Sequence, residues 1–164
     1  MNDNYNFEIY ILKLQDLIED SLNILYRDDY DLIRDKQELA CAARLLFIMQ
    51  NRIGNSEKYK SLKGYSVDSE YRLLGKRRKL LPSRLNGFRP DLIVHKRYHN
   101  DNLIVLELKM CSKRLYEDRI KLRDLTNHNG DYKYKLGASI VLSIDNPLIE
   151  YYVDGRIMRF QNEN

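Results

Sequence analysis

The chain of 164 residues contains no tryptophan and only two cysteines, three prolines and seven glycines. So few prolines and glycines argue against a disordered protein or a fold built from loops, because both classes are rich in these residues. No apolar run approaches the ~20 residues that a helix needs to cross a bilayer. Cys41 and Cys111 belong to no Cys-x-x-Cys pair or Cys/His cluster, so we expect two unpaired thiols and no structural zinc site.

The rest of the composition is that of a folded protein. Hydrophobic residues make up 43% of the chain and charged residues 32%, enough to build a core and a well-solvated surface. The length fits one domain. The first residues have neither the basic region nor the apolar stretch of a signal peptide. We therefore expect a single cytoplasmic domain with no membrane partner.

The formal net charge of +4 is unevenly distributed along the chain. Residues 1–38 hold ten acidic and four basic side chains, whereas residues 39–164 hold fourteen acidic and twenty-four basic ones. A positive domain attracts polyanions such as nucleic acids. An ordinary lysine-rich surface has the same composition, so the charge alone does not separate these two interpretations.

Two segments repeat apolar residues every three or four positions, which predicts two amphipathic helices. The first spans residues 6–27 and has an acidic opposite face. The second spans residues 36–53 and ends at Gly54. Its apolar stripe includes Leu39, Ala43 and Leu46, with Ala42, Leu45 and Met49 beside it. The polar residues 55–64 that follow predict a loop.

Apolar and alternating segments predict a series of strands in the rest of the chain. These strands cover residues 65–72, 89–96, 102–109, 136–144, 149–153 and 157–160. Asp154-Gly155 predicts a tight hairpin between the last two, and residues 113–127 predict a helix. This order is typical of an α/β protein with a mixed central sheet flanked by helices.

Two predicted neighbouring strands carry the residues that indicate chemistry. Asp91 opens the strand 89–96, and Glu107 and Lys109 close the strand 102–109. Because side chains alternate along a strand, Glu107 and Lys109 share one face. If Asp91 lies on that face too, the antiparallel register pairs residues whose numbers sum to 198. That register places His95 opposite Leu103 and leaves residues 97–101 as the loop.

In this register the Cβ atoms of Asp91 and Glu107 lie ~5 Å apart. Protonation of one carboxyl group would relieve their repulsion, and so would a bound Mg²⁺ or Mn²⁺. With the Lys109 ammonium beside such an ion, the site would suit phosphodiester hydrolysis, because the metal acidifies water and the lysine orients the nucleophile or stabilises the oxyanion. The alternative is a structural pair of carboxylates, one of them salt-bridged to Arg89 or Lys109.

The stretch Pro90-Asp91 and, after fifteen residues, Glu107-Leu108-Lys109 resembles the motif of the PD-(D/E)XK nuclease superfamily, which includes many restriction enzymes and junction resolvases. The resemblance implies a restriction-endonuclease-like αβββαβ core over residues 35–145. An N-terminal helical extension, residues 1–34, would precede this core, and a C-terminal β-hairpin, residues 146–164, would follow it.

The resemblance also implies roles for particular residues. Asp91 and Glu107 would bind Mg²⁺ or Mn²⁺, and Lys109 would position or activate the attacking water. Many members add a glutamate from the preceding helix or the first strand, for which this chain offers Glu38 and Glu70. Glu38 has a second interpretation as the third helical residue of a capping box that begins at Asp35. Glu70 fits a solvated strand face almost as well as a metal site.

Basic residues in two segments are candidate contacts to nucleic-acid phosphates, although basic helices are often only solvated faces. They are Lys76, Arg77, Arg78 and Lys79 before the second strand, and Lys113, Arg114, Lys121 and Arg123 after the third. We therefore expect a divalent-metal-dependent nuclease, with DNA rather than RNA as its substrate because most of the family acts on DNA. We also consider a homodimer, because small nucleases that cut two strands often dimerise. The alternative is an inactive nuclease-fold module that binds nucleic acid or a protein partner.

Overall fold

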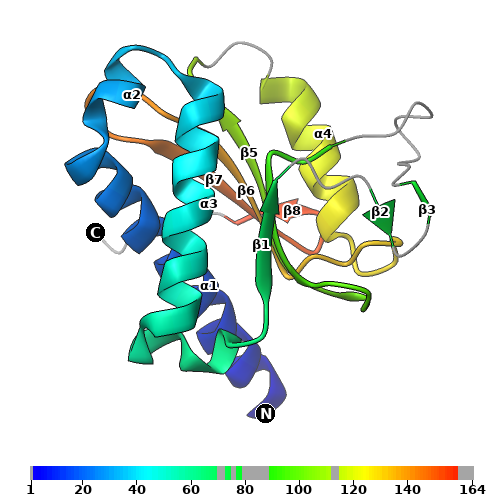
Figure 1. Cartoon of the computed structure of the whole chain (residues 1–164). Coiled ribbons are helices and arrows are strands. Elements are labelled where there is room, and N and C mark those ends of the chain that lie inside the picture. The colour runs from blue at the N-terminus through cyan, green and yellow to red at the C-terminus, as the bar shows by residue number, and fades with distance from the viewer. Residues whose placement is uncertain (1, 70–72, 75–76, 79–88, 112–114, 159–164) are drawn as a thin grey trace, which may run out of the picture.

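A six-stranded mixed β-sheet with helices on both faces organises the structure, a computed structural model that describes residues 2–69, 73–74, 77–78, 89–111 and 115–158 (Figure 1). The strand order is β1-β4-β5-β6-β7-β8, in which β5 and β6 are parallel and every other neighbouring pair is antiparallel. The strands are β1 (Ser66–Ser69), β4 (Leu92–Lys96), β5 (Asp101–Lys109), β6 (Leu136–Val141), β7 (Leu148–Val153) and β8 (Arg156–Ile157). Sequence and structure therefore agree on an α/β protein with a mixed sheet.

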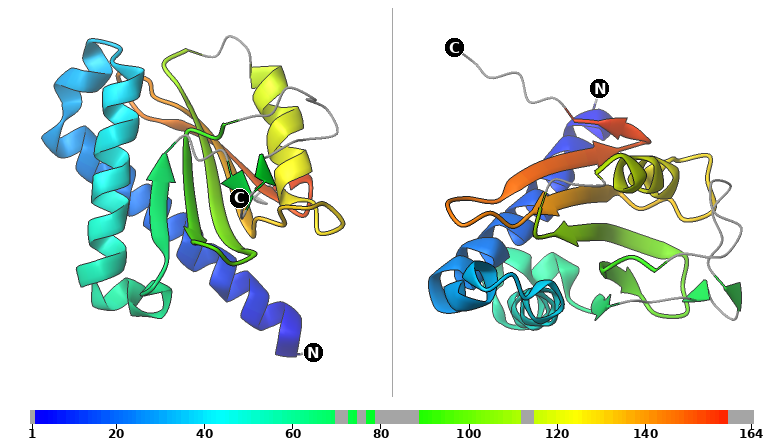
Figure 2. Two further views of the ribbon diagram at one scale, coloured as in Figure 1. Left: turned by 45° about the vertical axis from the view of Figure 1, so that its right-hand side comes forward. Right: turned by 90° about the horizontal axis from the view of Figure 1, so that it is seen from above.

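The helices form two layers, one on each face of the sheet (Figure 2). They are α1 (Asn2–Asp28), α2 (Tyr30–Arg34), α3 (Glu38–Asn55), the 3₁₀ helix η1 (Glu57–Leu62) and α4 (Leu115–Thr126). Helices α1 and α3 cover one face, and α4 covers the other. No helix within the described residues is long and apolar enough to cross a membrane.

Alternate side chains of the central strands point into two separate cores, because successive side chains of a strand lie on opposite faces of the sheet. Leu92, Leu106 and Leu108 pack in the larger core with α1 and α3. Ile93 and Val105 face the other way and pack beneath α4. The α4 face is thus where the residues two positions along from Ile93 and Val105, namely 91 and 107, should lie.

The predicted apolar stripe of the second helix is confirmed at Ala42, Leu45 and Met49 and is wrong at Leu39 and Ala43, which are exposed. Leu39 is 76% exposed, while the residues that α3 turns into the core are Cys41, Ala42, Leu45, Ile48, Met49 and Ile53. The buried residues form a longer and bulkier stripe than Leu39, Ala43 and Leu46, and so remove more apolar surface from water. Two short elements also differ from the prediction, because α2 forms between the two predicted helices and η1 forms within the predicted loop.

The predicted register between β4 and β5 is confirmed from Leu92 to Val94. Leu92 pairs with Leu106, and Val94 pairs with Ile104, so the numbers sum to 198. A β-bulge then shifts the register, and His95 pairs with Asn102 instead of the predicted Leu103. The bulge lets consecutive residues of β5, 103 and 104, both enter the larger core. It lies away from the end of the strand pair that carries Asp91 and Glu107.

The last two strands form the predicted hairpin. Asp154 and Gly155 both have positive φ angles, +50° and +71°, as a two-residue turn of this kind requires. Val153 pairs with Arg156 on either side of the turn.

Gly137 in β6 allows α4 to lie close to the sheet. A Cβ atom at this position would lie 2.9 Å from Thr126 Cγ2 and 3.3 Å from both Leu122 Cδ2 and Tyr152 Cβ. Thr126 cannot turn away at low cost, because its hydroxyl donates to Leu122 O and accepts a hydrogen bond from the backbone N–H of Gly155. The glycine therefore sets the distance between α4 and the strands beneath it.

We expect Gly137→Ala to lower the free energy of unfolding by about 1–3 kcal/mol, because the added methyl group overpacks the contact with α4. Urea denaturation measures the change. Gly54→Ala in α3 is the matched control, since no described atom lies within 4 Å of a Cβ atom there and alanine is the better helix former. Equal effects of the two substitutions would contradict the close-packing role of Gly137.

Candidate functional site

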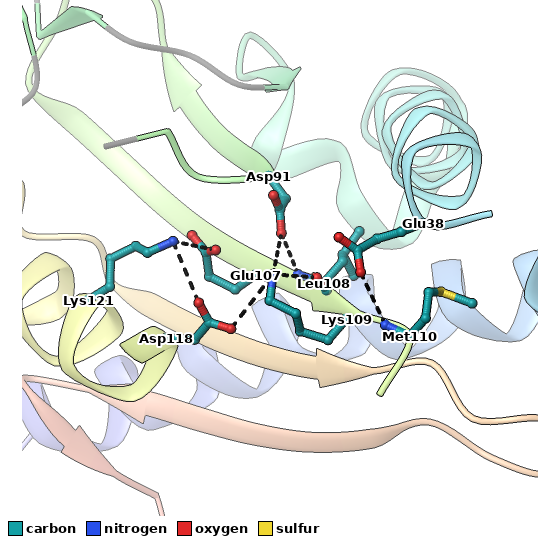
Figure 3. Close-up of polar contacts among 8 residues, drawn as sticks. All are labelled: Glu38, Asp91, Glu107, Leu108, Lys109, Met110, Asp118 and Lys121. Atoms are coloured by element: carbon teal, nitrogen blue, oxygen red, sulfur yellow. Dashed lines mark hydrogen bonds and ion pairs between the residues drawn. The ribbon is translucent and has the colours of Figure 1, made fainter. Parts of the chain in front are cut away.

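The candidate site lies where the end of β5 meets the start of β4, beneath the first half of α4 (Figure 3). Asp91, Glu107 and Lys109 converge there on the α4 face of the sheet. Lys109 Nζ lies 3.9 Å from Asp91 Oδ2, and the charge of Asp91 acts on Glu107. The structure thus brings together the three residues that the sequence motif singles out.

A backbone hydrogen bond fixes the Asp91 side chain. Asp91 immediately precedes β4, and its Oδ2 accepts the N–H of Leu108 on β5 at 2.7 Å. Partial burial raises the pKa of Asp91, against the opposing effects of this hydrogen bond and of Lys109. Among the described residues, this hydrogen bond uses only one of the two oxygens of the Asp91 carboxylate.

Glu107 is the most deeply buried acidic residue of the site, with 1% of its surface exposed. Its Oε2 accepts a hydrogen bond from Lys121 Nζ at 2.5 Å. Its Oε1 is buried and has no hydrogen-bond partner among the described residues, and the same is true of Ser139 Oγ on the neighbouring strand. Burial raises the pKa of Glu107, an effect that Lys121 opposes and that Asp91 and Asp118 reinforce.

Lys109 lies among carboxylates without touching one closely. Its Nζ is 3.9 Å from Asp91 Oδ2 and 3.8 Å from Asp118 Oδ2, and it donates to the carbonyl oxygen of Leu108 at 3.0 Å. Burial alone would lower the pKa of Lys109, but the surrounding carboxylates, Asp91 first among them, raise it above its usual value. Lys109 is therefore a cation at neutral pH.

Helix α4 adds Asp118, which the sequence motif does not include, and Lys121, which we expected to contact phosphates and not Glu107. Asp118 and Lys121 are both buried and lie one helical turn apart, with Lys121 Nζ 3.7 Å from Asp118 Oδ1. The signal that locates them is the apolar stripe of Leu122 and Leu125. Asp118 precedes Leu122 by four residues and Lys121 precedes Leu125 by four, so both extend the buried stripe toward the site.

Glu38 reaches the site from α3, but not as a helix cap. The capping-box prediction is wrong, because α3 begins at Glu38 itself and its N-cap, Gln37, makes no side-chain capping bond. Lys36 has a left-handed backbone conformation, with φ of 55°, so Asp35 is not continuous with the helix. Glu38 Oε2 instead accepts the N–H of Met110 at 3.2 Å. The two acidic residues Glu38 and Asp91 also line one cavity of about 160 Å³.

Several candidate residues lie outside the described part of the chain: Glu70, Lys76, Lys79, Lys113 and Arg114. Arg77 and Arg78 form a short strand, β3 (Arg77–Arg78), which pairs with β2 (Leu73–Leu74), and only their backbone is described.

Two candidate phosphate contacts on α4 differ in exposure. Arg123 is exposed, as a surface contact requires. Lys121 is buried against Glu107, so its expected place on a phosphate-binding surface is wrong. Its position above the apolar core, held by a carboxylate, explains why it does not face solvent.

The residues present match the chemistry of a hard divalent cation. In the described ranges, no group of three or more His, Cys, Asp or Glu side chains is arranged to hold a metal ion. Mg²⁺ nevertheless uses one or two carboxylates and keeps several waters. Asp91 and Glu107 supply oxygen donors, and Glu107 Oε1 is a buried acceptor without a described partner. Including Glu38 and Asp118, four carboxylates face two lysines among the described residues (Figure 3), so negative charge is in excess.

We expect Asp91→Ala to lower the free energy of unfolding by about 1–3 kcal/mol, because the buried N–H of Leu108 loses its acceptor. Asp91→Asn keeps an acceptor oxygen and should retain most of the stability. Chemical denaturation without added metal compares the two variants. Equal losses would show that the hydrogen bond to Leu108 contributes nothing measurable.

Comparison with known proteins adds no assignment to this geometry. No protein-family model matches the sequence, and no curated protein matches it.

Proposed function

We propose that this protein is a divalent-metal-dependent nuclease that hydrolyses phosphodiester bonds, with DNA as the favoured substrate. One observation carries the proposal. Asp91, Glu107 and Lys109 meet on one face of two paired strands, and Glu107 has a buried oxygen for which the described residues provide no partner. A structural carboxylate pair would not need an unsatisfied buried oxygen, which costs free energy.

The chain's own residues have distinct tasks in this proposal. The carboxylates of Asp91 and Glu107 would hold Mg²⁺ or Mn²⁺, and Asp91 is already oriented by the N–H of Leu108. When bound there, the ion would lower the pKa of a water molecule and neutralise charge on the phosphate. Lys109 acts as a fixed cation that orients the nucleophile or stabilises the oxyanion. Its raised pKa favours these roles over proton abstraction.

The order of the elements supports a restriction-endonuclease-like core. Reading from α3, the chain continues through β1, β4, β5, α4 and β6, which is the αβββαβ order implied by the motif. The short pair β2 and β3 is an addition between β1 and β4. Glu38 comes from the helix that precedes the first strand and faces the cavity beside Asp91, so it is a third candidate carboxylate.

The choice of nucleic acid as substrate is supported by charge. Residues 39–164 carry ten more basic than acidic side chains, and the exposed Arg123 lies on the helix that contributes to the site. Phosphate contacts of this kind position a substrate without reading its sequence. We therefore include single-stranded, linear and branched DNA, together with RNA, in the test.

A second candidate function is an inactive module of the same fold that binds nucleic acid or a protein partner. The ion pair between Glu107 and Lys121 favours it, because Glu107 already has an internal cation. Calorimetric titration with Mg²⁺ and Mn²⁺ separates the two functions. Binding favours the enzyme, and the absence of binding favours the module.

We expect purified protein to cleave at least one of these substrates with Mn²⁺ or Mg²⁺, and EDTA to stop the reaction. Glu107→Gln should reduce the rate by about a hundredfold or more, since it removes a charged ligand at the reacting centre. Glu57→Gln is the control, because Glu57 lies on η1 and its side chain is 90% exposed. A wild-type protein that cleaves none of the substrates with either metal would refute the nuclease.

Lys109→Met should separate metal binding from turnover. We expect the Mn²⁺ dissociation constant to change by no more than about threefold, while the cleavage rate falls about a hundredfold, since the lysine stabilises charge in the transition state and is not a ligand. Lys60→Met, at a residue whose side chain is 75% exposed, is the matched control. Loss of Mn²⁺ binding in Lys109→Met would instead assign Lys109 to the structure of the metal site.

A further inference from the structure

The cation nearest to Glu107 in the described chain is Lys121. Its Nζ lies 2.5 Å from Glu107 Oε2, and the two side chains are only 8% and 2% exposed. A buried carboxylate of this kind requires a counter-charge. A divalent cation bound by Glu107 would provide that charge from the same side of the strand, so the ion and the Lys121 ammonium compete for one carboxylate.

Lys121 has a second acceptor within reach. Asp118 lies one turn earlier on the same helix, and its Oδ1 is 3.7 Å from Lys121 Nζ. The other oxygen, Oδ2, is buried without a hydrogen-bond partner in the described part of the chain. Because both residues project from α4 at a spacing of three, a rotation of the Lys121 side chain transfers its ammonium from Glu107 to Asp118 without movement of the helix.

We propose that Lys121 is an internal counter-cation that occupies Glu107 until a divalent metal ion binds, and that its ammonium then moves to Asp118. This inference rests on the proposed metal site and adds a step to its loading. Lys121 holds the buried carboxylate in the metal-free protein, and Asp118 receives the displaced charge. Asp118 acts through Lys121 and is not itself a metal ligand.

Mn²⁺ titration followed by electron paramagnetic resonance tests the exchange without any need for cleavage. At about pH 8.5, where protons compete less for the carboxylates than at neutral pH, Lys121→Met should bind Mn²⁺ roughly tenfold more tightly than the wild type, because the competing ammonium is gone. Asp118→Asn should bind it roughly tenfold more weakly, because the displaced ammonium has lost its acceptor. Circular dichroism establishes that each variant is folded.

The double variant Lys121→Met/Asp118→Asn is decisive. In the exchange, Asp118→Asn has a much smaller effect once Lys121 is absent, because only the general charge of Asp118 then acts on the site, so the two changes are strongly non-additive. If Asp118→Asn weakens Mn²⁺ binding equally in both backgrounds, Asp118 acts on the bound ion without Lys121 and the inference is wrong. Unchanged or weaker binding by folded Lys121→Met also overturns it, as does unchanged binding by Asp118→Asn. If the wild type and all variants bind no Mn²⁺, the proposed metal site fails as well, an outcome distinct from the others.

Discussion

The contact between Glu107 and Lys121 is the interaction on which the site depends. A carboxylate at the end of an apolar strand, close to Asp91, is unfavourable unless a cation lies beside it. Lys121 supplies that cation only because α4 lies near the sheet, and α4 lies near the sheet because Gly137 has no side chain. The electrostatics of the site and the packing of the second core are therefore parts of one constraint.

The topology explains why α4 provides the partners of Glu107. Strands β5 and β6 are parallel, so the chain must cross over between them, and α4 makes that crossover. The helix begins soon after β5 ends, which places its first turns beside the carboxyl end of the strand. Asp118 and Lys121 consequently lie near Glu107, while Leu122 and Leu125 pack farther back with Val105.

The convergence of Asp91, Glu107 and Lys109 could be predicted because strand alternation and hairpin register are local rules. The bulge after Val94 could not, since it depends on which residues the larger core accommodates. The burial of Lys121 could not be predicted for a related reason. A charged residue on a helix is normally assigned to solvent, and only the tertiary packing of α4 reveals a buried acid beneath it. The role of Glu38 likewise depends on contact with Met110, 72 residues away.

The two lysines of the site differ in the contacts that hold them, and this difference separates their tasks. Lys109 Nζ lies beyond hydrogen-bond distance of both neighbouring carboxylates, at 3.8 and 3.9 Å, and is anchored by a backbone carbonyl. It can therefore direct its charge toward a substrate while it remains within the field of the acids. Lys121 instead makes a short contact with Glu107 and is almost fully buried, so its charge stabilises that carboxylate. A single lysine could not do both, because a cation that neutralises the buried acid is not available to a phosphate outside it.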